Sequence, residues 1–110
     1  FGMTMGEMAT AVMHNIATIA IVMDNGTWGS EIAYQRDFYN QRYIGAHVLS
    51  PRFDEVMKLC GGNGYFATEP GDTAEAVRQA MQDGKPAVIH VKVDPDAVLS
   101  FRRDALQKRG

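Results

Sequence analysis

The stretch IAIVMDNGTWGSE, residues 19–31, joins an apolar run directly to two short polar residues, two glycines and the only tryptophan of the chain. Residues 16–23 have the length of one strand and are apolar on both faces, as strands buried in a parallel sheet are. Upstream, apolar residues recur at helical spacing over residues 4–14. The sequence therefore predicts a helix, a buried strand, and a loop that leaves the carboxyl end of that strand.

A second helix is predicted after residue 50. Ser50 is a typical N-cap residue, Pro51 fits the first helical position, and Gly61-Gly62 is a typical end. Its expected buried face is the apolar stripe Phe53, Val56, Met57 and Cys60. The long polar and aromatic stretch before this helix contains residues 30–40, which favour a further helix.

The last third of the chain continues the alternation of strands and helices. A short strand is expected over residues 64–68, and the strongest strand pattern covers residues 87–93. Between them, Asp72 is expected to cap a helix, with Glu75 as its capping-box partner. The predicted buried face of this helix is Ala76, Val77, Ala80 and Met81. This order predicts an α/β fold: a layered, mainly parallel sheet with flanking helices.

Composition limits the functional classes. The chain has 110 residues, 45% of them hydrophobic, and a formal net charge of −2, which suits one ordinary folded domain. The near-balanced charge argues against a broad nucleic-acid surface. The longest apolar run is far short of the roughly 20 residues that span a bilayer. The single cysteine, Cys60, excludes an internal disulfide and fits a reducing cytoplasm, so we expect a cytoplasmic protein that binds neither nucleic acid nor membrane.

The polar residues that follow the first strand are the strongest candidates for a site. Ligands of open parallel sheets collect at the carboxyl ends of the strands. Asn25 offers a carboxamide oxygen, and Gly26 lets the backbone bend so that the carbonyl of Thr27 can face inward. Neutral oxygen ligands suit Mg²⁺ shared with substrate phosphates. Asp-Asn-Gly is also a common turn, and the spacing alone leaves both interpretations open.

The surrounding residues carry a resemblance to a known family. VMDNGTWGSEIAYQRDFYNQRYIGAH, residues 22–47, resembles the second half of the thiamine-diphosphate motif in the pyruvate-oxidase and acetolactate-synthase group of enzymes. That motif begins Gly-Asp-Gly and ends Asn-Asn, with a helix and a buried strand between its halves. Asn25 matches the second Asn, whereas Asp24 replaces the first.

Within this group the chain is most similar to the sulfoacetaldehyde acetyltransferase family. The pattern Asn-Gly-x-Trp-Gly-x-Glu begins at Asn25, and Gln-x-Asp-Phe-Tyr-Asn-x-Arg-x-x-Gly begins at Gln35. The sequence FRRDAL, residues 101–106, resembles a motif near the C-terminus of that family. The resemblance implies that residues 1–110 are the C-terminal portion of a thiamine-diphosphate-binding domain, equivalent to the last fifth of a family member.

The resemblance also implies a cofactor site for Mg²⁺ and thiamine diphosphate. The Asn25 side chain and the Thr27 main-chain oxygen would be two of three protein ligands of Mg²⁺, and the third, the Asp of Gly-Asp-Gly, would precede Phe1. The implied cofactor-binding residues are Asn25, Gly26, Thr27, Trp28, Gly29, Ser30 and Glu31. Catalytic residues remain unknown, because the family's activating glutamate belongs to another domain, contributed by a partner subunit. We therefore expect the isolated chain to be inactive and the parent to be a homodimer or homotetramer.

The implied reaction converts sulfoacetaldehyde and phosphate to acetyl phosphate and sulfite. The alternatives are an acetolactate-synthase-like carboligase, a 2-oxoacid decarboxylase, or a noncatalytic α/β oligomerisation module.

Several further residues are candidates that also have simpler roles. Glu31 could contact the substrate or the cofactor, or it could be a surface glutamate at the start of a helix. Arg102 and Arg103 could clamp a sulfonate or phosphate, but a solvated tail is the simpler interpretation. His14 and His90 are expected to be structural, whereas His47 is a candidate polar site residue. Packing or a dimer interface is expected for Trp28, Tyr34, Phe38, Tyr39 and Tyr43.

Overall fold

The computed structural model describes residues 1–100 and divides the chain into two compact units. Unit 1 combines residues 1–24 with residues 50–93, and unit 2 combines residues 25–49 with the segment that starts at Asp94. Among the described residues, no helix has both the length and the apolar character needed to cross a membrane. The predicted FRRDAL motif, with Arg102 and Arg103, lies outside the described residues.

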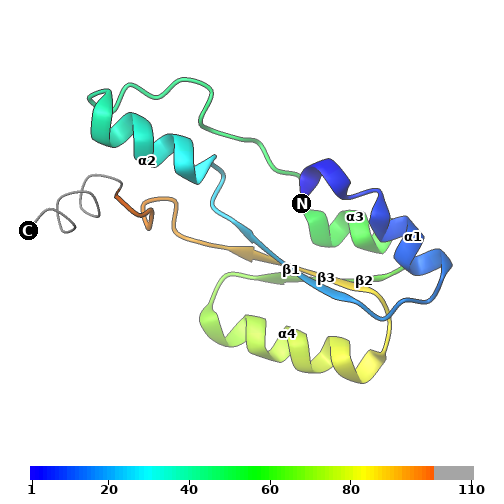
Figure 1. The fold of residues 1–110 in the computed structure, drawn as a ribbon. Coiled ribbons are helices and arrows are strands. Elements are labelled where there is room, and N and C mark those ends of the chain that lie inside the picture. Colours follow the sequence, from blue (N-terminus) through cyan, green and yellow to red (C-terminus); the bar gives the residue numbers. More distant parts are fainter. Residues whose placement is uncertain (101–110) are drawn as a thin grey trace, which may run out of the picture. The chain divides into compact units, whose positions relative to one another are not determined.

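Unit 1 is built on a three-stranded parallel sheet, as predicted (Figure 1). Its strands are β1 (Ile19–Asp24), β2 (Asn63–Ala67) and β3 (Ala87–Lys92), in the order β1-β3-β2. The central strand β3 is buried over its first four residues, which explains its nearly continuous apolar sequence. Residues 16–18 were predicted as strand but lie before β1, so the strand is shorter than its apolar run.

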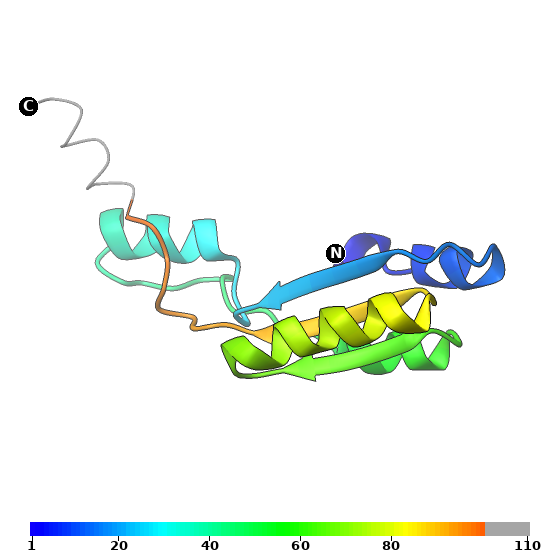
Figure 2. The same cartoon turned by 90° about the horizontal axis from the view of Figure 1, so that it is seen from below.

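Helices cover both faces of this sheet (Figures 1 and 2). A short 3₁₀ turn η1 (Gly2–Thr4) precedes α1 (Glu7–Met13), so the helix predicted over residues 4–14 is broken near its start. Helices α1 and α3 (Phe53–Leu59) lie on one face, and α4 (Pro70–Asp83) lies on the other.

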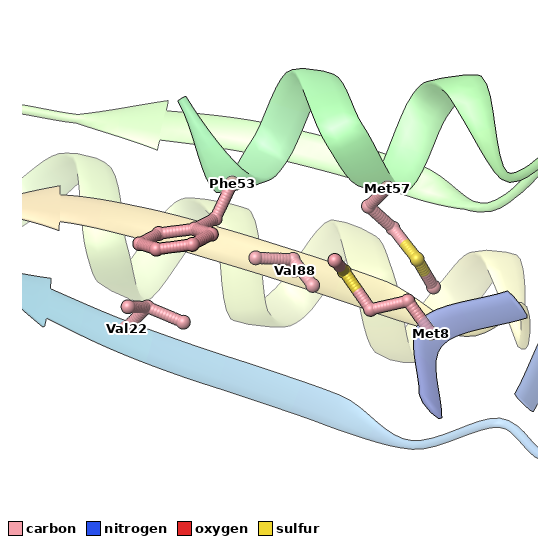
Figure 3. Packing of buried hydrophobic residues seen from close by; sticks show 5 residues of the cluster. All are labelled: Met8, Val22, Phe53, Met57 and Val88. Carbon is pink, nitrogen blue, oxygen red and sulfur yellow. The ribbon is translucent and has the colours of Figure 1, made fainter. Parts of the chain in front are cut away.

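Two clusters of apolar side chains fill the space between the sheet and its helices. The cluster beneath α1 and α3 consists of Met8, Val22, Phe53, Met57 and Val88 (Figure 3). Val56 and Cys60 pack against it, so the predicted apolar stripe of this helix is confirmed. The cluster beneath α4 contains Ala67, Ala76 and Ile89. Val88 and Ile89 therefore contribute to opposite faces of the sheet, as neighbouring strand residues must.

The predicted helix caps were wrong at both helices of the second half. The N-cap of α3 is Arg52, not Ser50, because the first helical N–H, that of Phe53, donates to Nδ1 of His90 at 3.1 Å. The N-cap of α4 is Glu69, and Asp72 is its reciprocal capping-box partner three residues later, with Pro70 in the first turn.

The predicted buried face of α4 is only partly correct. Ala76 and Ala80 are buried and Val77 packs against the cluster, but Met81 is 69% exposed. The buried stripe is narrow because small alanines, one helical turn apart, make the close contact with the sheet. Met81 lies about 100° around the helix from Ala80, outside that stripe.

Gly64 lies directly against the backbone of α3. A Cβ at this position would overlap the carbonyl oxygen of Asp54 and lie 2.6 Å from its carbonyl carbon. Because both groups belong to the backbone, no side-chain rotation can relieve the overlap. The contact between α3 and β2 therefore requires glycine here.

We predict that Gly64→Ala lowers the free energy of unfolding by about 3 kcal/mol, since α3 must move away from β2. Urea unfolding followed by circular dichroism measures this change. Gly71→Ala in α4 is the matched control, because a Cβ there meets nothing within 4 Å and should be neutral or stabilising. Equal stability of the Gly64→Ala and Gly71→Ala variants would contradict the close approach.

Candidate functional site

The loop that follows β1 forms a tight turn within unit 2. Oδ1 of Asn25 accepts a hydrogen bond from the backbone N–H of Thr27 at 3.0 Å, and Gly26 has a φ of +69°. This side-chain-to-backbone bond is typical of an Asx-turn. The prediction that Asp-Asn-Gly forms a turn is therefore confirmed. Oδ1 keeps a second lone pair, so the turn is compatible with a ligand at the same oxygen.

Thr27 is held in a short antiparallel bridge with His47. The Trp28 N–H donates to the Ala46 carbonyl at 2.8 Å, and the Val48 N–H donates to the Gly26 carbonyl at 2.9 Å. Within residues 1–100, the Thr27 carbonyl oxygen accepts no hydrogen bond, and the buried Thr27 hydroxyl has no partner. The bridge thus brings the backbone of His47 beside Thr27, while the His47 ring packs edge-on against Tyr43.

Helix α2 (Gly29–Phe38) begins directly after this bridge, with Trp28 at its N-cap. Gly29 lies close to the turn, since a Cβ there would be 3.5 Å from Nδ2 of Asn25. Ser30 and Glu31 are exposed in the first turn of the helix, and Trp28 is 57% exposed. The predicted cofactor-binding residues 25–31 therefore form one continuous turn and helix start.

Sequence reasoning missed two residues that organise the rest of unit 2. The Gln35 side chain accepts the N–H of Ile44 at 2.7 Å and donates to the Ile44 carbonyl at 3.0 Å. The Arg36 guanidinium donates to the Val98 and Leu99 carbonyls at 3.4 and 3.1 Å, which holds the segment after Asp94 against α2. Both contacts join residues distant in sequence to backbone atoms, so no local pattern reveals them.

The described aromatic residues of unit 2 lie at its surface. Tyr34 contacts the rings of Phe38 and Tyr39, with centroids 5.0 and 5.7 Å apart. Each of Trp28, Tyr34, Phe38, Tyr39 and Tyr43 is more than a third exposed. They are not core residues of this unit, and an interface role for them stays a prediction.

Unit 1 carries a buried polar cluster at the carboxyl end of its sheet. His90 is 1% exposed and lies mid-strand in β3, as expected. Its Nε2 is 3.0 Å from Oδ2 of Asp24, the last residue of β1. Lys92 also donates to Oδ2 of Asp24, at 3.0 Å. The other two histidines, His14 and His47, are exposed.

Asp54 forms the second part of this cluster. It is fully buried, and the Arg52 guanidinium donates to both of its carboxylate oxygens at 2.8 and 2.7 Å. The guanidinium also lies over the Phe66 ring, 3.5 Å from its centroid. Burial alone would raise the pKa of Asp54, but the hydrogen bonds and charge of Arg52 outweigh it, so the pKa is lowered.

We predict that Asp54 makes stability depend on pH. A lowered folded-state pKa means that the stabilisation is present above the unfolded value of about 3.9 and is lost as the pH falls through the folded value. Removing the donors with Arg52→Met leaves the buried carboxylate unpaired, so the variant should be less stable at pH 7. The deficit should shrink near pH 3, because the buried carboxyl group that Arg52→Met leaves without its donors becomes protonated as the pH falls.

Urea unfolding at pH 7, 5 and 3 measures this dependence. Arg78→Met is the matched control, because Arg78 pairs with Glu75 on an exposed surface and should contribute little at any pH. A deficit of Arg52→Met that is equal at pH 7 and pH 3 would mean that Arg52 acts through packing on Phe66 and not through the charge of Asp54.

The donor set of the loop is suited to a shared cation. The described part of the chain contains no group of three or more His, Cys, Asp or Glu side chains arranged to hold a metal ion. The turn offers neutral oxygens instead: the Asn25 carboxamide and the Thr27 carbonyl that accepts no hydrogen bond from residues 1–100. Such a set fits Mg²⁺ only where phosphate or another chain segment supplies negative charge.

Residues 1–91 match the family described as "Thiamine pyrophosphate enzyme, C-terminal TPP binding domain". The chain belongs to this family of thiamine-pyrophosphate enzymes, which confirms the resemblance found in the sequence.

Individual relatives agree with this assignment. The chain is 37% identical to the sulfoacetaldehyde acetyltransferase of Alcaligenes xylosoxydans xylosoxydans and 35% identical to that of Castellaniella defragrans. Each match covers 98% of this chain and 19% of the relative. It is 33% identical to the acetolactate synthase large subunit IlvG of Mycobacterium tuberculosis, over 93% of the chain and 19% of the relative. The chain thus spans about a fifth of the length of these curated relatives.

Proposed function

We propose that residues 1–110 are the C-terminal portion of the cofactor-binding domain of a thiamine-diphosphate-dependent acetyltransferase. Its reaction converts sulfoacetaldehyde and phosphate to acetyl phosphate and sulfite. The similarity to two sulfoacetaldehyde acetyltransferases over nearly the whole chain supports this substrate class. The observation that carries the cofactor role is the turn after β1, which leaves the Thr27 carbonyl without a hydrogen bond from residues 1–100.

In this proposal the turn holds the metal that accompanies the cofactor. The Asn25 carboxamide oxygen and the Thr27 carbonyl oxygen bind Mg²⁺, and the positive φ of Gly26 lets the backbone bend between them. Trp28, Gly29, Ser30 and Glu31 border the cofactor at the start of α2. When bound, thiamine diphosphate supplies the nucleophilic carbon, whereas these residues supply its position.

The two oxygens of the turn are neutral and fill only part of the coordination shell of Mg²⁺. In this proposal the cofactor diphosphate and another segment of the full-length protein supply the remaining ligands. We propose that a partner subunit of a homodimer or homotetramer contributes the glutamate that activates the cofactor.

An assay of the full-length protein tests the reaction. With thiamine diphosphate and Mg²⁺, we expect sulfite release from sulfoacetaldehyde that depends on added phosphate. Acetolactate formation from pyruvate would instead favour the carboligase alternative, which the similarity to acetolactate synthases keeps open. If the protein forms neither sulfite nor acetolactate, the result would favour a noncatalytic α/β module.

We predict that Asn25→Ala in the full-length protein weakens the affinity for Mg²⁺ and thiamine diphosphate at least tenfold. The substitution removes a metal ligand and also the bond that shapes the turn. Isothermal titration calorimetry measures the affinity. Gln82→Ala is the matched control, because it removes an amide from the exposed surface of α4. Unchanged affinity of the Asn25→Ala variant would contradict the proposed site.

A further inference from the structure

We propose that His90 is a positioning residue for the cofactor loop: in a fixed ring tautomer, it holds the Asp24 carboxylate at the end of β1. The effect of His90 on cofactor binding rests on the proposed function. The tautomer and the contact with Asp24 are argued from distances within unit 1. Nothing in the family resemblance or the comparisons assigns a role to His90.

The fold encloses the His90 ring on several sides. His90 pairs in register with Val22 of β1 and Phe66 of β2. The Phe66 ring meets it edge-on at 5.5 Å between centroids, and the Phe53 ring lies at 5.7 Å. Because the imidazole is 1% exposed, solvent cannot satisfy its two nitrogens. Each nitrogen therefore needs a partner inside the protein.

The partners determine which nitrogen carries the proton. The backbone N–H of Phe53 can only donate, and it lies 3.1 Å from Nδ1. Nδ1 must therefore be the acceptor, and a neutral imidazole then has its proton on Nε2. Nε2 is 3.0 Å from Oδ2 of Asp24, so Nε2–H donates to the carboxylate. The first N–H of helix α3 thus selects the tautomer that binds the end of β1.

Asp24 is anchored to β3 through both its side chain and its backbone. Its Oδ2 accepts hydrogen bonds from His90 and Lys92, each at 3.0 Å. Its carbonyl oxygen accepts the N–H of Val93 at 3.1 Å. Asn25 is the next residue of the chain, so these bonds fix the point from which the loop leaves the sheet.

The carboxylate of Asp24 explains why such donors are needed, because it carries a charge and has only acceptors. A carboxylate that is 8% exposed is stable only when donors surround it. The side chains of His90 and Lys92 meet this need. The second charged pair of the cluster, Arg52 with Asp54, is satisfied separately, since Asp54 Oδ1 is 3.7 Å from Nδ1.

Two conservative variants separate the two halves of this arrangement. His90→Gln keeps an N–H donor near the position of Nε2 and loses the Nδ1 acceptor. His90→Asn keeps an acceptor near the position of Nδ1 and loses the donor to Asp24. In the full-length protein, we expect His90→Asn to weaken the affinity for thiamine diphosphate with Mg²⁺ by roughly tenfold relative to His90→Gln, as losses of outer-shell partners do.

Nuclear magnetic resonance of the wild-type full-length protein, labelled with ¹⁵N in its histidine rings, tests the tautomer directly. The His90 signal, assigned by its loss in His90→Asn, should show a proton on Nε2 alone at pH 7. A proton on Nδ1 would overturn the proposal, and either variant that folds is enough to assign the signal.

The calorimetric outcomes distinguish this inference from the proposed function. Equal affinities of His90→Asn and His90→Gln, with a large loss in Asn25→Ala, would overturn the role of His90 and leave the cofactor site standing. An unchanged affinity in Asn25→Ala would reject the cofactor site itself, while the tautomer would still be tested by resonance.

Discussion

The parallel pairing of β3 with both of its neighbours is the constraint on which unit 1 depends. Because β1 and β2 both run parallel to β3, the three strands end at the same edge of the sheet. Parallel strands need crossover connections, and the helices that make them cover both faces of the sheet. The central strand is consequently removed from water over most of its length, and any polar group on it must be satisfied within the protein.

The buried polar residues of the described chain are Asp24, Asp54 and His90, and they lie together at that edge. Each has a specific partner, so the desolvation cost of the charges is offset by hydrogen bonds. The bonds join β1, β3 and the start of α3, which come from three distant parts of the sequence. A polar cluster of this kind discriminates against alternative registers of β1 and β3, because a shift by one residue would separate the Asp24 carboxylate from His90 and Lys92.

Periodicity predicted the α-helices and strands of unit 1, because these elements are short, strongly patterned and separated by glycines, asparagines and prolines. The errors at the start of α3 and on the buried face of α4 arise from contacts between distant residues. Ser50 is a better N-cap by local rules than Arg52, but the Phe53 N–H is satisfied by a histidine 37 residues away. Met81 fits the predicted stripe of α4, but the alanines and Val77 make the contact with the sheet and leave Met81 exposed.

The candidate loop was recognisable because residues 25–31 carry a distinctive pattern within a short segment. The contacts of Gln35, Arg36 and His90 could not be recognised from the sequence, because each depends on a backbone atom or a strand register that only the folded chain supplies. A partial signal existed for His90: it is a histidine within the most strand-like run of the sequence, which implies a buried ring with two nitrogens to satisfy.

Unit 1 is interrupted in the sequence by residues 25–49, which belong to unit 2. The strands and helices on either side of the interruption pack on one another, so the sheet does not draw its core from the inserted segment. For a flexible segment, doubling the length would add only about 0.6 kcal/mol to the entropy cost of closing it. The insert can therefore change in length and sequence at little cost to the packing of the sheet.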